Sequence, residues 1–472
     1  MNTSFVIYDL VFMVVFTLAV VYFISKNKHR MLKQGWMYLY RTRWGIKLID
    51  STAKKYQTLL RPLQYVVIVL GYVLMVSILW VMIYSTYVYV RYPIIVEMIK
   101  APPIIPLIPY FTDIFNLQSV FPPFYFTYFL VALVIVAVVH EFSHGIFARL
   151  HKIKIHSTGF AFLGPILGAF VEQDEKQMNK AKKIPQLAIL GAGVFANIVF
   201  ALLFLALIWI FFVAAFAPAG VFFTNYALDA VPRAEIVSID NFSLVMGFPA
   251  LNLSEKFISL QTKNKTYFAQ PALLKKSFEQ NVSNVLVYRD SPAFASKLSG
   301  AITAINGESI YSYEKLGVVL AQYPPGEIIE ITTLSRGEVV NTRLTLGTND
   351  QGKAFLGITV PDPSRANSFA GMLYSITPKV ENALTGIHFE SKLGDFGIFF
   401  FHMLWWVMTI NFFVALFNML PLGILDGGRF FYLTVLGLTK SEKVGKRAFA
   451  VVTWIIIALL VIMMLRWAFS VF

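Results

Sequence analysis

The chain has 472 residues, of which 57% are hydrophobic and only 14% are charged. Soluble globular domains carry about 25% charged residues, so this composition excludes a purely soluble protein and predicts a polytopic membrane protein. The chain contains no cysteine, which excludes disulfides and thiolate metal ligands and leaves His, Asp and Glu as metal donors.

The net charge of +14 is concentrated in short segments beside apolar stretches. Residues 26–61 hold ten Lys/Arg and one acid, residues 149–183 hold seven and three, and residues 439–447 hold four and one. Residues 219–395, by contrast, hold 15 basic and 16 acidic residues. Basic clusters that flank apolar spans are typical of cytosolic loops and of contacts with anionic lipids. The pattern therefore favours a lipid bilayer over nucleic acid as the partner.

Apolar segments long enough to cross a bilayer predict about six transmembrane helices. In chain order they cover residues 5–25, 63–90, 124–150, 184–217, about 397–417 and 448–469. The basic segment 26–61 is expected in the cytosol, partly at the membrane interface, and the first span is read as a retained helix because no cleavage pattern follows it. Residues 91–123 contain seven prolines and are expected to form an extracytoplasmic loop.

The third span ends in the pentad His140-Glu141-Phe142-Ser143-His144. Histidines four residues apart lie on one helix face, so both imidazoles can reach one metal ion, and the glutamate can reach a water bound to that metal. Ionisable groups within a membrane span are costly and indicate function. The alternative is a pair of interfacial histidines beside a glutamate that extends to the head groups.

Two polar features flank this helix in the chain. Residues 156–175 are apolar but broken by glycines and a proline, which favours a short hairpin beside the metal helix over an ordinary interfacial loop. The fourth span contains the small residues Gly191, Ala192, Gly193 and Ala196, which let a neighbouring helix approach closely. Asn197 follows them, either as a packing hydrogen bond or as part of a polar active-site wall.

Residues 219–370 read as a soluble α+β domain between two spans. The run from Glu327 to Leu346 predicts a hairpin that turns at Arg336-Gly337. Counting the spans places the domain outside the cytosol. Five Asn-X-Ser/Thr acceptors lie on segments assigned outside the cytosol, which agrees with this placement: Asn2, Asn241, Asn252, Asn264 and Asn281.

The fifth span breaks between Asn418 and Arg429 at a Pro/Gly-containing stretch that includes Asp426. The same counting of spans puts His140, His144 and Asp426 near the cytosolic side, so one site can include all three. A catalytic zinc takes three protein ligands and a water, and Asp426 supplies the missing oxygen donor. The alternative is that Asp426 caps the helix that starts at Gly427.

These motifs together resemble the site-2 protease family of intramembrane zinc metalloproteases. The resemblance is carried by the pentad, by Asn418-x-x-Pro421-x-x-x-x-Asp426-Gly427 and by the segments Gly164–Phe170 and Gly193–Asn197. It implies Zn²⁺ bound by His140, His144 and Asp426, Glu141 as general base, and Asn418 at the substrate backbone. We also assign Gly164, Pro165, Gly168 and Asn197 to the substrate side. Residues 285–360 resemble a PDZ domain, with Ser291-Pro292-Ala293 and Ala304-Ile305-Asn306-Gly307 in matching places, although Ser299-Gly300-Ala301 replaces the usual Gly-Asp.

The sequence thus predicts a polytopic α-helical membrane protein with an inserted extracytoplasmic PDZ-like α+β domain. The expected parts are residues 1–122, the protease core 123–218, the external domain 219–370 (PDZ-like at about 280–362), the core helix 371–438 and the last span 439–472. The predicted function is hydrolysis of a peptide bond within or near the membrane span of membrane-protein substrates. The alternatives are a zinc protease that uses a downstream glutamate and cuts prenylated tails, an ion-binding transporter, and a silent peptide-binding scaffold.

Overall fold

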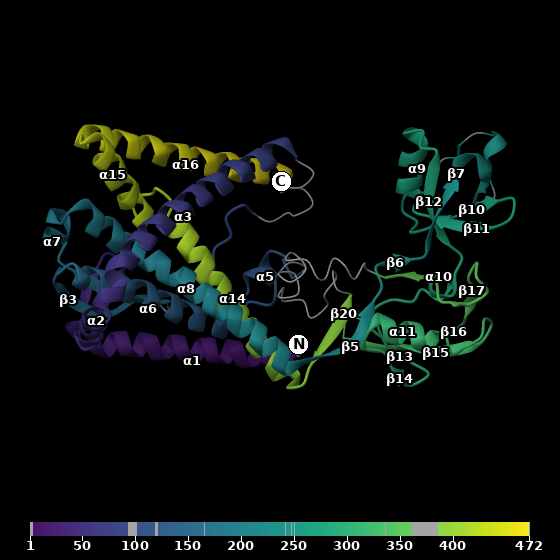
Figure 1. Ribbon diagram of the computed structural model, residues 1–472, viewed down its shortest axis with the longest axis horizontal. Helices are drawn as coiled ribbons and strands as arrows, with labels where there is room; N and C mark the ends of the chain where they lie inside the picture. Colours follow the sequence, from purple (N-terminus) through teal and green to yellow (C-terminus); the bar gives the residue numbers. More distant parts are fainter. Residues whose placement is uncertain are drawn as a thin grey trace. The chain divides into compact units, whose positions relative to one another are not determined.

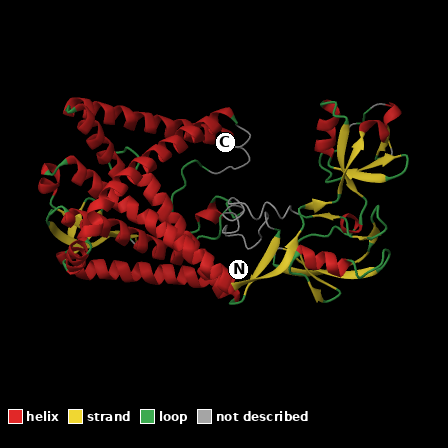
Figure 2. Cartoon of the chain, in the orientation of Figure 1, coloured by secondary structure: helices red, strands yellow, loops and turns green. Residues whose placement is uncertain are grey.

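The computed structural model describes residues 3–92, 102–118, 121–164, 166–240, 242–246, 248–249, 251–335, 337–360 and 386–471. The chain divides into two compact units: unit 1 comprises Met1–Phe212 and Asp395–Phe472, and unit 2 comprises Val213–Gly394. Figure 2 shows that unit 1 is built mainly from helices and unit 2 mainly from strands.

Six helices of the described chain are long and apolar enough to cross a membrane, and all but a few end residues of two of them lie in unit 1 (Figure 1). They are α1 (Thr3–Asn27), α3 (Gln57–Arg91), α6 (Phe126–Leu150), α8 (Lys183–Ala215), α14 (Gly394–Asn418) and α16 (Glu442–Val471). Helices of spanning length therefore occur in the predicted number and order. Shorter helices of this unit are α2 (Trp44–Lys55), α5 (Phe111–Ile114), α7 (Glu175–Lys180) and α15 (Asp426–Thr439).

Unit 1 also holds one antiparallel sheet with the strand order β1-β2-β3-β4. The hairpin of β3 (Ile155–Leu163) and β4 (Ile166–Gln173) confirms the predicted hairpin, and β4 packs beside α6. Strands β1 (Leu32–Gln34) and β2 (Met37–Thr42) extend it, with Tyr38 opposite Phe162. The sequence interpretation missed these two strands because it treated residues 26–61 only as a basic interfacial segment. Apolar side chains along β2 pack beside Val20 of α1 and Phe162 of β3.

Unit 2 contains two six-stranded sheets, each with its own hydrophobic core. The first has the order β16-β15-β13-β5-β20, with β14 beside β13, and the second has the order β7-β12-β11-β10-β8-β9. The strands of the first sheet are β5 (Phe216–Phe222), β13 (Ala301–Ile305), β14 (Glu308–Ser309), β15 (Ile328–Ser335), β16 (Glu338–Thr345) and β20 (Ile387–Ser391). Helices α10 (Pro292–Ala295) and α11 (Tyr313–Leu320) contribute to its core.

The second sheet is formed by β7 (Leu228–Pro232), β8 (Ile236–Ile239), β9 (Phe242–Ser243), β10 (Ile258–Thr262), β11 (Thr266–Ala269) and β12 (Asn284–Arg289), and α9 (Pro271–Glu279) packs with it. Small strand pairs join β17 (Gly347–Thr348) to β18 (Ala354–Phe355) and β6 (Asn225–Tyr226) to β19 (Ile358–Thr359). The sequence interpretation assigned Val285–Arg289 to the PDZ-like segment. Strand β12 instead pairs with β7 and β11, because Val285 and Val287 are buried in the core of the second sheet.

The predicted hairpin between Glu327 and Leu346 is present as β15 and β16, and Gly337 has the left-handed φ of +83° that its turn requires. Arg336 lies outside the described residues, as do Asn2, Asn241 and residues 361–385.

Candidate metal centre

Helix α6 brings His140 and His144 to one face, as their spacing predicts. Both side chains are largely buried, and their Nε2 atoms lie 3.0 Å apart. Asp426 approaches from α15: its Oδ2 is 3.1 Å from His140 Nε2 and 3.2 Å from His144 Nε2. The structure therefore joins two residues of α6 to a carboxylate 282 residues or more away in sequence, as the sequence predicted.

The break between α14 and α15 sets the position of Asp426. Asp426 is the first residue of α15, and Leu425, in extended conformation, holds the N-cap position. The alternative role of Asp426 as the helix cap is therefore not what the structure shows. Two glycines let the chain fold back tightly after the break: a Cβ at Gly427 would lie 2.3 Å from Met419 C, and one at Gly428 would lie 2.1 Å from Leu422 O.

The three donor atoms fit a shared metal ion. Zinc bound tetrahedrally at about 2.0–2.1 Å from each N or O donor would hold those donors about 3.3 Å apart. The observed separations of 3.0, 3.1 and 3.2 Å are close to that triangle. Two imidazoles and a carboxylate also match the donor types that zinc takes in catalytic sites.

The other ring nitrogens of the two histidines are oriented by α8. His144 Nδ1 lies 2.6 Å from the carbonyl oxygen of Ile189, to which it can donate when its Nε2 is free to bind metal. His140 Nδ1 lies 3.1 Å from the side-chain amide of Asn197, which is fully buried. The amide oxygen of Asn197 has no other partner among the described residues, so with the amide turned over it accepts from His140 Nδ1–H.

Helix α8 comes this close to the histidines because residue 193 is glycine. A Cβ on Gly193 would lie 2.5 Å from His144 Nε2 and 2.6 Å from His140 Cε1. No real Cβ contact is that short, so any larger residue would displace one of the two rings or α8 itself.

Glu141 and the free edge of β4 lie beside this centre. Val171 N–H donates to Glu141 Oε2 over 3.1 Å, so the backbone groups of Val171 point away from β3. A cavity of about 440 Å³ is lined by the three donor residues, by Glu141 and by alternate residues of β4. Those residues are Ala169, Val171 and Gln173, and Asn418 of α14 lines the same cavity.

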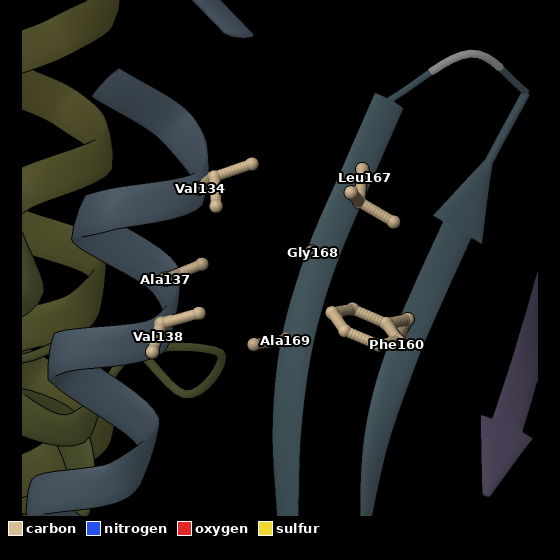
Figure 3. A pocket seen from close by; sticks show the side chains of 7 residues that line it. All are labelled: Val134, Ala137, Val138, Phe160, Leu167, Gly168 and Ala169. Carbon is tan, nitrogen blue, oxygen red and sulfur yellow. The ribbon is translucent and has the colours of Figure 1, made fainter. Parts of the chain in front are cut away.

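Gly168, one of the hairpin residues predicted on the substrate side, lies on β4 towards the hairpin turn. Figure 3 shows a small pocket between α6 and the hairpin, lined by Val134, Ala137, Val138, Phe160, Leu167, Gly168 and Ala169. Gly168 is thus next to the helix that carries the pentad. Gly164, with φ +58°, makes the turn between the strands, and Pro165 lies outside the described residues.

Asn197 differs from its sequence assignment: it contacts a histidine and not the cavity, because it is fully buried on α8. The interpretation missed Ile189, Val171 and the steric role of Gly193. Ile189 and Val171 act through backbone atoms, which every residue type supplies, so their identities carry no signal. Gly193 had a signal in the small-residue run of the fourth span.

Comparisons with known proteins agree with this geometry. The chain is 28% identical over 201 residues to the zinc metalloprotease RasP of Shouchella clausii, an alignment that covers 37% of this chain and 48% of RasP. It is 45% identical over 71 residues to the uncharacterized protein MJ0971 of Methanocaldococcus jannaschii, covering 15% of this chain and 19% of that protein. The chain thus spans less than half the length of these curated relatives.

The model of peptidase family M50 matches residues 128–463, a range that includes the pentad, the hairpin, unit 2 and Asp426. The six membrane-length helices and the three clustered metal donors are what a membrane metalloprotease requires. The chain therefore belongs to peptidase family M50, the site-2 protease family.

Proposed function

We propose that this protein is an intramembrane zinc metalloprotease that hydrolyses a peptide bond within or near the membrane span of other membrane proteins. The observation that carries the proposal is the convergence of His140, His144, Asp426 and Glu141 on one cavity between membrane-length helices. RasP, whose name describes a zinc metalloprotease, supports the assignment of the metal as zinc.

Each residue of the centre has a chemical task in this proposal. When bound, zinc supplies a Lewis acid for the scissile carbonyl and a water whose pKa is lowered towards about 7. Glu141 Oε2 would accept a proton from the attacking water and pass it to the leaving amine. The contacts of His140 with Asn197 and of His144 with Ile189 hold both rings in the orientation that a metal ligand needs.

The free edge of β4 offers a way to hold the substrate. A helical substrate cannot be cut while its carbonyls are bonded to amides four residues on, so it must unwind locally. An unwound segment can add as a strand to an exposed sheet edge, and β4 is the edge strand beside Glu141. Asn418, at the end of α14, would bind backbone groups of the same segment.

The proposal extends to the placement of the chain in the membrane. We place the metal centre towards the cytosolic side and unit 2 outside, on the charge bias of the loops. We also propose that the first sheet of unit 2, with its helices α10 and α11, is PDZ-like. The partners are then membrane proteins with a transmembrane helix and the lipid bilayer, and no nucleic acid.

Elemental analysis of the purified protein tests the metal centre. The wild type should hold about one zinc per chain, and Asp426→Ala should lose most of it, because a three-ligand site is reduced to two. Glu141→Gln should keep the zinc and lose cleavage of a reconstituted single-span substrate. Full zinc retention in Asp426→Ala would place the third ligand elsewhere, and substantial proteolysis by Glu141→Gln would remove Glu141 as the base.

A further inference from the structure

A second and larger cavity adjoins the metal centre. Its volume is about 480 Å³, and it runs along one face of α14 opposite the proline-rich segment that precedes α6. We call it the α14 groove. It is lined by Pro103, Ile105, Pro106, Leu107, Phe111, Phe121, Trp406, Thr409, Ile410, Phe413, Val414, Phe417 and Asn418.

The α14 groove adjoins the metal cavity. Val414 and Asn418 line both cavities, so one end of the groove lies beside the place where a scissile bond would lie. At the other end it is lined by aromatic rings. Trp406 packs against Phe111 and Phe121, and its indole N–H donates to Pro123 O over 3.0 Å.

The groove is apolar, and Thr409 is a polar side chain in it without a hydrogen-bond partner among the described residues. Thr409 is only 8% exposed. Helical threonines normally satisfy the hydroxyl with the carbonyl four residues earlier. Thr17, Thr86, Thr434 and Thr439 of this chain all do so. An unpaired hydroxyl is costly away from water, so the Thr409 hydroxyl is available to a polar group of a ligand in the groove.

The length of the groove sets the length of segment that it can hold. Trp406 and Asn418 are twelve residues apart on α14, which corresponds to about 18 Å. A segment bound there must be unwound where it reaches the metal cavity, because a helix keeps its carbonyls bonded to amides four residues on. An extended chain covers the same length with about five residues.

We propose that the α14 groove holds an extended, apolar segment of the substrate next to the bond that is cut, with large aliphatic or aromatic side chains, and that Thr409 binds a backbone group of that segment. The inference rests on the proposed function and identifies the part of the substrate that it selects. Asn418 would then contact the same segment at its metal end, where its exposed backbone enters the cavity.

Photo-crosslinking tests this proposal with two neighbouring phenylalanines. Phe412 and Phe413 are each 44% exposed, but only Phe413 lines the groove. The photoreactive residue p-benzoylphenylalanine is placed at either position in Glu141→Gln protein in phosphatidylcholine vesicles. The probe is a biotinylated, lysine-flanked leucine peptide that spans the bilayer and carries a central Asn-Gly break followed by Phe and Leu.

We expect at least a fivefold higher yield of peptide adduct from position 413 than from position 412. Equal yields, or adducts at 413 to phospholipid alone, would overturn the proposal, since the groove would then be a lipid-facing surface. Replacing Phe and Leu after the break by alanine should lower the adduct at 413. An unchanged yield would show that the groove does not select large apolar side chains.

The role of Thr409 is tested in catalytically intact protein with the same peptide. Thr409→Val keeps the shape and removes the hydroxyl, so KM should rise about three- to tenfold while the zinc content stays unchanged. Thr86→Val, on α3, is the control and should leave KM unchanged. An unchanged KM in Thr409→Val would contradict the backbone contact. If the peptide forms adducts at position 413 but the wild type does not cleave it, the protease proposal would be wrong, whereas peptide binding in the α14 groove would stand.

Discussion

At the residue scale, the metal centre depends on Gly193 having no side chain. Gly193 leaves room for the two imidazoles, and α8 in turn supplies the groups that orient them. The pentad by itself does not fix the direction of the rings. Their orientation comes from a helix that is about fifty residues further along the chain.

Gly193→Ala should therefore weaken metal binding strongly. A methyl group 2.5 Å from His144 Nε2 must displace that ring or the helix, and loss of ligand orientation costs about 10- to 100-fold in metal affinity. The measurement is a zinc-chelator competition on the purified protein. Gly437→Ala is the control, since a Cβ there meets nothing within 4 Å and alanine favours the helix. Wild-type zinc affinity in Gly193→Ala would show that α8 can withdraw without disturbing the ligands.

At the element scale, α1 fixes the start of the metal-binding helix. Asp9 of α1 is 2% exposed, and its carboxylate accepts hydrogen bonds from the backbone N–H groups of Phe126 and Thr127, at 2.8 and 3.0 Å. The hydroxyls of Thr127 and Tyr110 donate to it as well, each over 2.6 Å. Phe126 and Thr127 are the first residues of α6, and their N–H groups have no partner within the helix. The Asp9 carboxylate of α1 thus takes the place of an N-cap side chain for α6, and its negative charge complements the dipole of that helix.

Asp9→Ala should lower the unfolding free energy by about 2–4 kcal/mol, because it leaves several buried donors unpaired. The check is thermal unfolding in detergent, where we expect a melting temperature lower by several degrees. Asp9→Asn keeps one acceptor oxygen and should lose less. Thr17→Val, on the same helix, removes only a local bond to Met13 and should change little. A wild-type melting temperature for Asp9→Ala would mean that the start of α6 is held by other groups.

Elements with a local pattern could be predicted, and those that depend on distant partners could not. Hydropathy gave the six spans, and the i, i+4 histidines gave the metal-binding face, because both patterns are complete within one helix. Strands β1 and β2 went unpredicted, since their pairing joins Tyr38 to Phe162 and has no signature in either segment. Asp9 did carry a signal, as a lone acid in an apolar span, but its partners on α6 are more than a hundred residues away.

At the scale of the whole molecule, unit 2 is an insertion whose two ends are neighbours. It enters through β5 and leaves through β20, and these strands pair with Ala217 opposite Glu390 and Phe216 opposite Ser391. Directly opposed residues of antiparallel strands have Cα atoms about 5 Å apart. Unit 1 meanwhile has its own hydrophobic cores, one of which joins α3, α8 and α15.

Unit 2 should therefore be removable without loss of the metal centre. Replacing residues 218–389 by Asn-Gly joins Ala217 to Glu390 through a two-residue hairpin turn, which is the geometry that this pair of strands favours. The shortened protein should hold about one zinc per chain and still cut the single-span peptide, because every proposed ligand and Glu141 lie in unit 1. A changed preference among natural membrane proteins would assign selection to unit 2. Loss of zinc from a shortened protein that still inserts and unfolds cooperatively would instead show that unit 2 maintains the geometry of the centre, and the division of the molecule into a catalytic core and a selecting insert would fail.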